Sequence, residues 1–284
     1  MSPKTWGEAL VEAAQVIGLR DARLIVGHVA EWSPAELALH ADDAVNAKCA
    51  ASIDSRVERR VAGEPLQYVL GSWGFRQLDL YVDRRVLIPR PETEWVVELA
   101  TAAINALRHS DGDAPLVVDL GTGSGAIGLS LAKEVPDAFV WLTDASADAL
   151  DVARLNLIGL GQAAVGRVEL RQGDWFSALP DALMGMISVV VSNPPYVKET
   201  DALPPEVEQW EPAAALRSGA EGLDDIRRIV AAAPQWLARP GAIVIEHAPD
   251  QGEAVQQLAR AAGAQETSTH PDLVGRPRCT VAKW

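Results

Sequence analysis

The sequence predicts an α/β protein with a doubly wound, mainly parallel sheet and a small helical domain on its N-terminal side. Strand-like and helix-like segments alternate from Leu116 onward, which is typical of parallel sheets with right-handed crossovers. Helix-start signals recur through residues 1–65, and residues 66–88 show the alternation of a β-hairpin. We therefore expect a helical domain over 1–65, a hairpin connector over 66–88 and the α/β domain over 89–284.

Short helices account for the first domain. Thr5 and Ser33 each precede a glutamate by three positions, which is the pattern of a capping box at a helix start. Asp21 is predicted to start the second helix and Asn46 the fourth, because both side chains can accept a bond from a free backbone N–H group. A glycine and a proline at positions 63 and 65 end the fourth helix.

The connector carries apolar residues at every second position. Leu78, Leu80 and Val82 alternate with polar or amphipathic neighbours, and glycines at 71 and 74 supply turns. The proline-containing stretch 89–94 then leads into a helix that runs to about Leu107. That stretch is either a plain helix start or a segment that closes over a bound cofactor.

The α/β domain follows from an alternating order of elements. Strands are predicted at 116–120, 138–143, 167–171, 186–192 and 242–246, with helices that begin near 125, 146, 223 and 250. The tail, 264–283, adds two short strand-like pieces around a Pro/Gly turn. The chain has 48% hydrophobic residues, enough to bury a substantial core.

Charge and composition exclude several classes of function. The net charge is −14, and residues 86–284 hold 27 acidic against 15 basic side chains. Nucleic-acid binding depends on cationic side chains that neutralise phosphates, so we expect no stable nucleic-acid binding and favour a protein partner with a basic surface. The opening segment carries Glu8 and Glu12 on a helical pattern, so we do not expect it to be a secretory signal, and no apolar run approaches membrane-spanning length.

Cysteine and histidine usage indicates a reducing compartment. Cys49 and Cys279 lie far apart without a CxxC spacing, and the five histidines form no metal-binding motif. We expect free thiols, no metal and a cytoplasmic protein. The chain is expected to act as a monomer.

A glycine-rich loop lies between the first predicted strand and its helix. Gly121, Thr122, Gly123 and Gly125 permit a tight turn that brings backbone N–H groups close to a ligand. The loop also fits the dinucleotide pattern GxGxxG, and Asp144 at the end of the second strand would suit the ribose of NAD or of S-adenosylmethionine equally. The loop alone does not choose the cofactor.

Two further acids favour S-adenosylmethionine. Asp119 places a carboxylate before the glycines, where it would attract the amino group of a methionine moiety and repel a pyrophosphate. Asp174 and Trp175 follow the third strand and offer an acceptor and an aromatic face to an adenine ring. Asp144 and Asp174 could instead simply cap the next helix or turn, the commoner role of an aspartate after a strand.

The tetrapeptide Asn193-Pro194-Pro195-Tyr196 follows the predicted buried strand 186–192. Two prolines fix two φ angles and push Asn193 out of the helical region, so the Asn193 amide and the Pro194 carbonyl form a rigid pair of acceptors beside an aromatic ring. Loops at the carboxyl ends of parallel strands are where such sheets bind ligands. A rigid turn without chemistry is the alternative.

These motifs together resemble the HemK/PrmC family of class I S-adenosylmethionine-dependent methyltransferases, and the match covers nearly the whole chain. The helical leader and the segment LIPRPETE discriminate it from nucleobase enzymes with the same tetrapeptide. The matching segments are Asp21–Leu24, Gly63–Tyr68, Leu87–Glu94, Asp119–Ile127, Val191–Tyr196, Glu211–Pro212 with Leu216, Gly222–Asp224, and Asp272 with Gly275 and Arg278. One departure is Ala248, where the family often has glycine.

The resemblance implies a function and a mechanism. The family methylates the side-chain amide nitrogen (N5) of the glutamine in the GGQ motif of class I peptide chain release factors, and S-adenosylhomocysteine is the by-product. Asn193 and the Pro194 carbonyl would accept the two N–H bonds of that glutamine, and Tyr196 would pack on the flat amide. Pro195 would complete the substrate site, with Asn193 also beside the cofactor.

Three rival functions stay open at this point. An adenine N6 methyltransferase on DNA or RNA would use the same tetrapeptide, although the acidic α/β domain opposes it. A dinucleotide-dependent oxidoreductase would use the same glycine loop. A cofactor-binding module without catalysis is the third.

Overall fold

A computed structural model describes residues 4–107 and 114–284, which form two compact units. The smaller unit comprises the described residues up to Ser72 together with Pro204–Trp210. The larger unit comprises Trp73–Leu203 and Glu211–Trp284. The segment Pro204–Trp210 therefore belongs to the smaller unit, although the residues before and after it in the sequence belong to the larger unit.

The smaller unit is entirely helical. Its helices are α1 (Trp6–Ile17), α2 (Leu19–Ala30), α3 (Pro34–Leu39), α4 (Ala47–Val61), α5 (Leu66–Leu70) and α10 (Pro205–Trp210). The predicted capping boxes at Thr5 and Ser33 are both present, and the Asn46 side chain caps α4 by accepting from the Cys49 N–H group. Asp21 does not start α2: Gly18, with φ of +82°, holds the capping position, and Asp21 lies in the first turn.

An arginine joins three segments of this unit. Arg60 Nε donates to Asp21 in α2 at 2.8 Å, and Arg60 Nη1 donates to Glu206 in α10 at 2.9 Å. The sequence pattern did not predict α10. Two acidic residues, Glu206 and Glu208, lie in its first turn, where their negative charges interact favourably with the positive end of the helix dipole.

The hairpin is shorter than the sequence suggested. Leu66–Leu70 is the helix α5, and the strands are β1 (Ser72–Phe75) and β2 (Leu78–Tyr81). The spacing explains the difference, because Leu66, Val69 and Leu70 stand three and four positions apart, which places them on one face of a helix. Leu66 and Val69 are buried there against Ile25.

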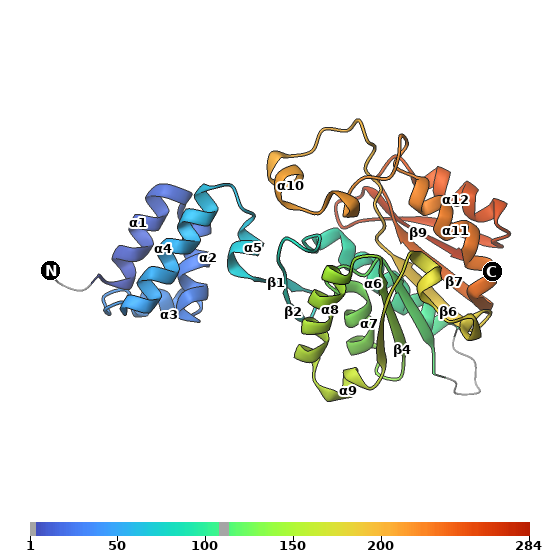
Figure 1. Ribbon diagram of the computed structural model, residues 1–284, viewed down its shortest axis with the longest axis horizontal. Helices are drawn as coiled ribbons and strands as arrows, with labels where there is room; N and C mark the ends of the chain where they lie inside the picture. Colours follow the sequence, from blue (N-terminus) through green and yellow to red (C-terminus); the bar gives the residue numbers. More distant parts are fainter. Residues whose placement is uncertain (1–3, 108–113) are drawn as a thin grey trace. The chain divides into compact units, whose positions relative to one another are not determined.

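The larger unit contains a seven-stranded sheet in the order β5-β4-β3-β6-β7-β9-β8 (Figure 1). The strands are β3 (Leu116–Leu120), β4 (Phe139–Asp144), β5 (Val168–Gln172), β6 (Ile187–Ser192), β7 (Leu237–Glu246), β8 (Glu266–Pro271) and β9 (Pro277–Lys283). Pairs from β5 to β7 are parallel, whereas β9 runs antiparallel to both neighbours. The predicted doubly wound, mainly parallel sheet is confirmed.

Helices cover both faces of this sheet. They are α6 (Glu94–Leu107), α7 (Ala126–Glu134), α8 (Ala147–Leu160), α9 (Gln162–Val165), α11 (Asp224–Trp236) and α12 (Gly252–Ala261), with 3₁₀ turns η1 (Pro91–Thr93), η2 (Trp175–Ala178), η3 (Asp181–Leu183) and η4 (Ala213–Ala215). Helices α6, α7 and α8 pack in sequence against one another, and α11 packs on α12 (Figure 1). One hydrophobic core of the described residues lies between the sheet and the α11–α12 layer.

Strand register brings four chain positions level at one edge of the sheet. Leu120 pairs with Thr143 of β4 and Ser192 of β6, and Ser192 pairs with Ile245 of β7. The next residue in each strand therefore lies at the same carboxyl edge: Gly121, Asp144, Asn193 and Glu246. After β3 the chain continues to β4 and β5 on one side of it and then to β6 and β7 on the other side. The edge beside β3 is therefore the topological switch point, where open α/β sheets bind ligands.

Some elements extend beyond their predicted bounds. Strand β7 starts at Leu237, five residues before the predicted start, and the tail strands β8 and β9 are both present. In the part of the chain that the structure describes, no helix combines the length and the hydrophobicity that crossing a bilayer requires.

Candidate active site

A cavity of about 350 Å³ opens at the carboxyl edge of the sheet. Small-molecule sites commonly have volumes of about 300 to 1,000 Å³. Eight of the residues singled out in the sequence line it: Gly121, Thr122, Gly123, Asp144, Asp174, Trp175, Asn193 and Pro195. The cavity therefore joins residues that are up to 74 positions apart in sequence but end neighbouring strands.

Asp119 stabilises the glycine loop through hydrogen bonds. The carboxylate is completely buried, and its Oδ2 accepts from the Thr122 hydroxyl at 2.6 Å and from Gly128 N–H at 2.9 Å. Oδ1 is buried without a partner in the described residues. Burial raises the pKa of Asp119 to about 6, against these two hydrogen bonds. Asp119 does not line the cavity, because the loop covers it.

Three glycines give the loop its path. Gly121, Gly123 and Gly125 all have positive φ, which other residues rarely adopt. A side chain at Gly121 would lie 3.1 Å from the Trp175 ring, so the glycine lets the indole pack directly on the loop. Gly125 precedes α7 and lies outside the cavity wall.

Asp144 is held in place by backbone donors. Its Oδ2 accepts from Gly123 N–H and its Oδ1 from Ser146 N–H, both at 2.9 Å. The first of these bonds joins the ends of β3 and β4. Burial raises the pKa of Asp144, so the carboxylate is a preoriented acceptor on a partly apolar wall.

Asp174 and Trp175 follow β5 and also line the cavity. The Asp174 carboxylate forms an ion pair with Arg228, so part of its accepting capacity is already used. Trp175 adopts a left-handed backbone, φ +50°, and its Nε1 donates to Asp225 Oδ1 at 3.2 Å. Asp225 is itself fixed by the Ser218 hydroxyl, which donates to Oδ2 at 2.8 Å. The indole orientation is therefore specified by a second aspartate that the sequence analysis missed.

Asn193 is oriented by a threonine 100 positions earlier in the chain. Its Nδ2 donates to Thr93 Oγ1 at 3.2 Å. Thr93 is buried and also lines the cavity. Among the described residues no hydrogen bond ends on Asn193 Oδ1 or on the Pro194 carbonyl, so both acceptors of the tetrapeptide stay available.

Tyr196 lies at the other end of the tetrapeptide and points away from the cavity lining. Its hydroxyl donates to Glu246 Oε1 at 3.0 Å, while Glu246 Oε2 is buried without a donor in direct contact. Burial raises the pKa of Glu246 to about 7, and the Thr93 hydroxyl contributes most among the interactions that lower it, ahead of Tyr196. Burial and the Glu246 charge raise the pKa of Tyr196 well above its ordinary value.

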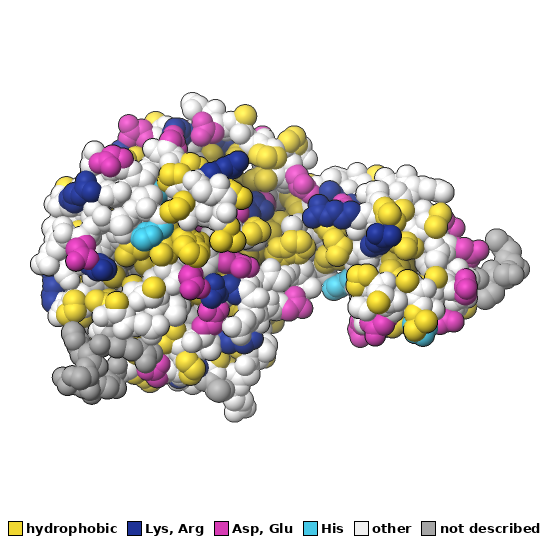
Figure 2. All heavy atoms as spheres, turned by 180° about the vertical axis from the view of Figure 1, so that it is seen from behind, with side chains coloured by type: hydrophobic (Ala, Val, Ile, Leu, Met, Phe, Trp, Pro, Cys, Tyr) yellow, Lys and Arg dark blue, Asp and Glu magenta, His cyan; other side chains and the backbone are white. Residues whose placement is uncertain are grey.

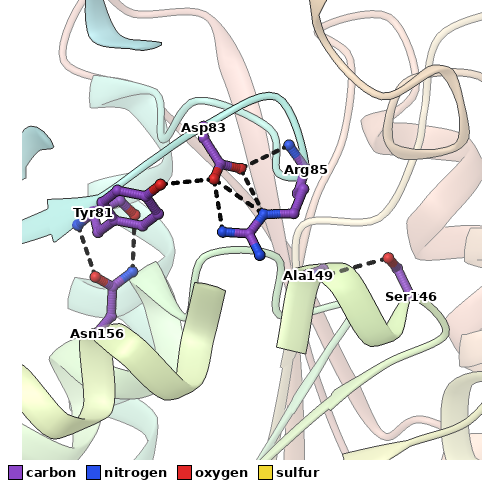
Figure 3. Close-up of polar contacts among 6 residues, drawn as sticks. All are labelled: Tyr81, Asp83, Arg85, Ser146, Ala149 and Asn156. Atoms are coloured by element: carbon purple, nitrogen blue, oxygen red, sulfur yellow. Dashed lines mark hydrogen bonds and ion pairs between the residues drawn. The ribbon is translucent and has the colours of Figure 1, made fainter. Parts of the chain in front are cut away.

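The segment after the hairpin forms another wall. Arg85, Val86, Leu87, Pro89 and Thr93 all line the cavity. Figure 3 shows the Asp83 carboxylate holding the Arg85 guanidinium, with Arg85 Nη2 to Asp83 Oδ2 at 2.7 Å.

The hairpin strand β2, which precedes this wall, is anchored to α8. Asn156 pairs with both backbone groups of Tyr81, accepting from its N–H at 2.7 Å and donating to its carbonyl at 3.0 Å (Figure 3). A further bond runs from Asn156 Nδ2 to the Ser124 carbonyl at 2.8 Å. One side chain therefore ties the hairpin strand to the glycine loop.

The sequence-predicted residues thus divide into two groups. The eight lining residues meet at one cavity, whereas Asp119, Gly125, Pro194 and Tyr196 are not part of its lining. Arg85 and Asp225 were not assigned a role, although Asp225 follows Asp224 in a matched segment. Thr93 belongs to the stretch 89–94, for which closure over a bound cofactor was one of two interpretations, and Pro89 and Thr93 both line the cavity. Among the described residues no cluster of three or more His, Cys, Asp or Glu side chains could hold a metal ion.

Comparison with known proteins gives family matches to both units. Residues 5–71 match the PrmC N-terminal domain, and residues 100–209 match the methyltransferase small domain. A release factor glutamine methyltransferase of Burkholderia pseudomallei is 40% identical over 98% of this chain and 96% of its own length. The chain belongs to the release factor glutamine methyltransferase family. Another member of this family, from Streptomyces coelicolor, is 45% identical over 80% of this chain and 78% of its own length.

Solved structures show the same fold at low sequence identity. The catalytic domain of human METTL16, in complex with an RNA hairpin, covers 84% of this chain and 82% of its own, with a TM-score of 0.56 and 13% identity. A methyltransferase from Pyrococcus furiosus covers 81% of this chain and 96% of its own, with a TM-score of 0.53 and 15% identity. This chain thus shares the fold of these solved methyltransferases.

Proposed function

We propose that this protein transfers a methyl group from S-adenosylmethionine to the side-chain amide nitrogen (N5) of the GGQ glutamine in class I peptide chain release factors. The observation that carries the proposal is the orientation of Asn193. Its Nδ2 is engaged by Thr93 on one side, so its Oδ1 is the free end beside a cavity of cofactor size. A fixed pair of carbonyl-type acceptors, Asn193 Oδ1 and the Pro194 carbonyl, matches the two N–H bonds of a primary amide.

The cavity residues fit S-adenosylmethionine in character. Asp144 would accept from the ribose hydroxyls, since both of its oxygens are already oriented by backbone donors. Gly121, Thr122 and Gly123 would bring backbone groups against the methionine portion, with Gly125 needed for the path of the loop. Asp119, which lies beneath the loop and outside the cavity lining, would support the methionine portion indirectly, because its Oδ2 accepts from the Thr122 hydroxyl and from Gly128 N–H.

Asp174 and Trp175 would hold the adenine end. Both line the cavity. Trp175 offers a ring face fixed by Asp225, and such stacking on an aromatic face contributes binding energy beyond simple burial. Because Arg228 already pairs with Asp174, we assign the adenine contact chiefly to the indole.

The residues of the tetrapeptide perform the chemistry by orientation. An amide nitrogen is a weak nucleophile because its lone pair is delocalised, and the same resonance sets a rotation barrier of about 18 to 20 kcal/mol. Fixed acceptors that hold both N–H bonds are oriented in advance, so they stabilise the positive charge that develops on the nitrogen during transfer. The cofactor's sulfonium supplies an electrophilic methyl group. A new N–C bond replaces the S–C bond, one N–H proton leaves, and S-adenosylhomocysteine remains.

The units take separate roles in this proposal. Residues 1–65 would recognise the release factor, residues 66–88 would connect, and residues 89–284 would bind the cofactor and catalyse transfer. Termination of translation occurs in the cytoplasm, so we place the enzyme there and infer that it acts as a monomer. Figure 2 supports a protein substrate, since basic side chains on the face it shows are interspersed with acidic ones over the larger unit. A net charge of −14 disfavours stable binding to DNA or RNA.

One assay tests the proposal directly. The protein is incubated with methyl-labelled S-adenosylmethionine and, in parallel, with a class I release factor, the same factor carrying Gln→Ala in GGQ, duplex DNA or RNA. We expect label only in the unaltered release factor, with N5-methylglutamine found by mass mapping of the GGQ peptide. Label in nucleic acid, or equal label in the altered factor, would overturn the assignment.

A further inference from the structure

Glu246 is a completely buried acid at the end of β7, and it belongs to no part of the cavity lining. A buried carboxylate is costly unless other groups stabilise it. Its surroundings come from three elements: Tyr196 from the tetrapeptide, Thr93 and Glu92 from η1, and Arg278 and Cys279 from β9. Among the described residues, the Tyr196 hydroxyl donates to Glu246 Oε1 at 3.0 Å, and the Thr93 hydroxyl is the neighbour that most lowers the pKa of Glu246. Both residues also connect to the proposed catalytic loop.

The two ends of the tetrapeptide therefore converge on one carboxylate. Tyr196 reaches Glu246 directly through its hydroxyl at 3.0 Å. Asn193 connects to it through Thr93, whose Oγ1 accepts from Asn193 Nδ2 at 3.2 Å and whose hydroxyl lowers the pKa of Glu246. Ser192, between the strand and the loop, takes no part, since its hydroxyl donates to the Leu120 carbonyl.

The Glu246 carboxylate determines which groups donate and which accept between Glu246, Thr93 and Asn193. An ionised carboxylate only accepts hydrogen bonds. The Thr93 hydrogen is therefore drawn toward Glu246, and its lone pairs are left for Asn193. A hydroxyl that accepts in this way selects the Nδ2 end of the Asn193 amide, so the Oδ1 end must face the reacting amide. Without the carboxylate, Thr93 could rotate and donate to Oδ1, which would reverse the amide.

We propose that Glu246 is a positioning residue for methyl transfer, which fixes through Thr93 the orientation of the Asn193 amide and through Tyr196 the far end of the same loop. This inference rests on the proposed role of Asn193 as the acceptor for the substrate glutamine. It assigns to Glu246 an effect on the transfer step and no direct contact with either substrate.

The test compares Glu246→Gln and Thr93→Val with two matched variants. Glutamine keeps the size of Glu246 but adds a donor, and valine keeps the shape of Thr93 but removes its hydroxyl. Thr93→Ser restores the hydroxyl. Thr101→Val is the control, because Thr101 in α6 also has a buried hydroxyl, and that hydroxyl has no partner in the described residues.

We expect kcat, measured with saturating release factor and cofactor, to fall roughly 10- to 100-fold in Glu246→Gln and Thr93→Val. The KM for release factor and the calorimetric Kd for S-adenosylmethionine should stay within about twofold, since neither variant removes a contact proposed for binding. Thr93→Ser should recover most of the rate, and Thr101→Val should match the wild type.

A double variant separates positioning from general loss of packing. Because Thr93 is proposed to act together with Glu246 on Asn193, Glu246→Gln combined with Thr93→Val should be about as slow as Glu246→Gln alone. Fully multiplicative losses, or a wild-type kcat in Glu246→Gln, would overturn the inference. If Glu246→Gln does not fold, as shown by its melting curve, wild-type kcat in Thr93→Val would overturn it equally. Absence of label in the release factor with wild-type enzyme would instead refute the proposed function itself.

Discussion

Asp144 ends β4 and Asn193 follows β6, so both lie at the carboxyl edge of the sheet. They serve different steps of the proposed reaction. We predict that Asn193→Ala lowers kcat by about 10² to 10³-fold, the usual loss when a preoriented transition-state partner is removed. Its Kd for S-adenosylmethionine should change little. Asp144→Ala should do the reverse and raise the cofactor Kd, because it deletes an acceptor held by two backbone N–H groups.

Isothermal titration with each variant, beside steady-state rates at saturating cofactor, separates the two effects. Ser192→Ala is a suitable control, because this hydroxyl binds only the Leu120 carbonyl next to the loop. Wild-type turnover by Asn193→Ala would remove the tetrapeptide from the mechanism. An unchanged cofactor Kd in Asp144→Ala would remove the ribose contact.

Ionisation of Glu246 makes a second prediction at this scale. Burial raises its pKa to about 7, with the charge of Arg278 opposing the rise and that of Glu92 adding to it. The ionised fraction grows with pH, and only the ionised form is purely an acceptor. We therefore predict that kcat falls as pH decreases through about 7.

The measurement is kcat against pH with both substrates saturating. Glu246→Gln has no titrating group at this position, so its profile should lack that acid limb while its absolute rate is lower. Tyr196 and Cys279 titrate far above this range because burial raises the pKa of each. An identical acid limb in the variant would assign the titration to another group.

At the scale of elements, contact between α7 and the sheet depends on one glycine. Gly128 N–H donates to Asp119 at 2.9 Å, and a side chain at Gly128 would lie 3.0 Å from both Asp119 Oδ2 and Leu142 Cγ. We predict that Gly128→Ala lowers the free energy of unfolding by about 1 to 3 kcal/mol, because both neighbours are held by strands and completely buried. It should also raise the cofactor Kd, since Asp119 braces the glycine loop.

Gly159→Ala in α8 is the matched control. No atom lies within 4 Å of the side chain it would gain, so alanine should stabilise the helix by about 0.5 to 1 kcal/mol. Urea unfolding of the two variants gives the comparison. A Gly128→Ala variant as stable as Gly159→Ala would show that α7 and β3 can separate without cost.

Sequence patterns predicted the elements whose causes are local. Capping boxes at Thr5 and Ser33, the glycine loop and the alternation of strands and helices in the α/β unit follow from short-range patterns. Strand ends gave the lining residues because parallel strands share one carboxyl edge. Thr93 and Glu246 could not be assigned in this way. Their roles depend on partners 100 and 50 positions away, which only tertiary packing supplies.

Short helices show the same limit. Leu66–Leu70 looked like the start of a hairpin, because five apolar or amphipathic residues carry too little periodicity to separate a strand from one helical turn. The helix α10 gave no strong signal, since its place is fixed by partners such as Arg60 in a different part of the chain. Burial of Asp119, with its raised pKa, likewise follows from loop packing and not from spacing.

At the scale of the whole molecule, the net charge of −14 should govern encounter with the protein substrate more than cofactor binding. If the release factor presents a basic surface, long-range attraction speeds association, and salt screens it. The Debye length shrinks from about 30 Å at about 0.01 M salt to about 8 Å at about 0.15 M. We predict that kcat/KM for release factor falls several-fold over this range.

The Kd for S-adenosylmethionine should change far less across the same salt series, because its contacts lie within a cavity walled by Asp144, Trp175 and the glycine loop. Pre-steady-state association of labelled release factor, measured beside single-turnover methylation, locates the effect. The association rate should carry the salt dependence while the methylation rate of the bound complex stays constant. A salt-independent association rate, or one that rises with salt, would show that the acidic surface does not attract this substrate.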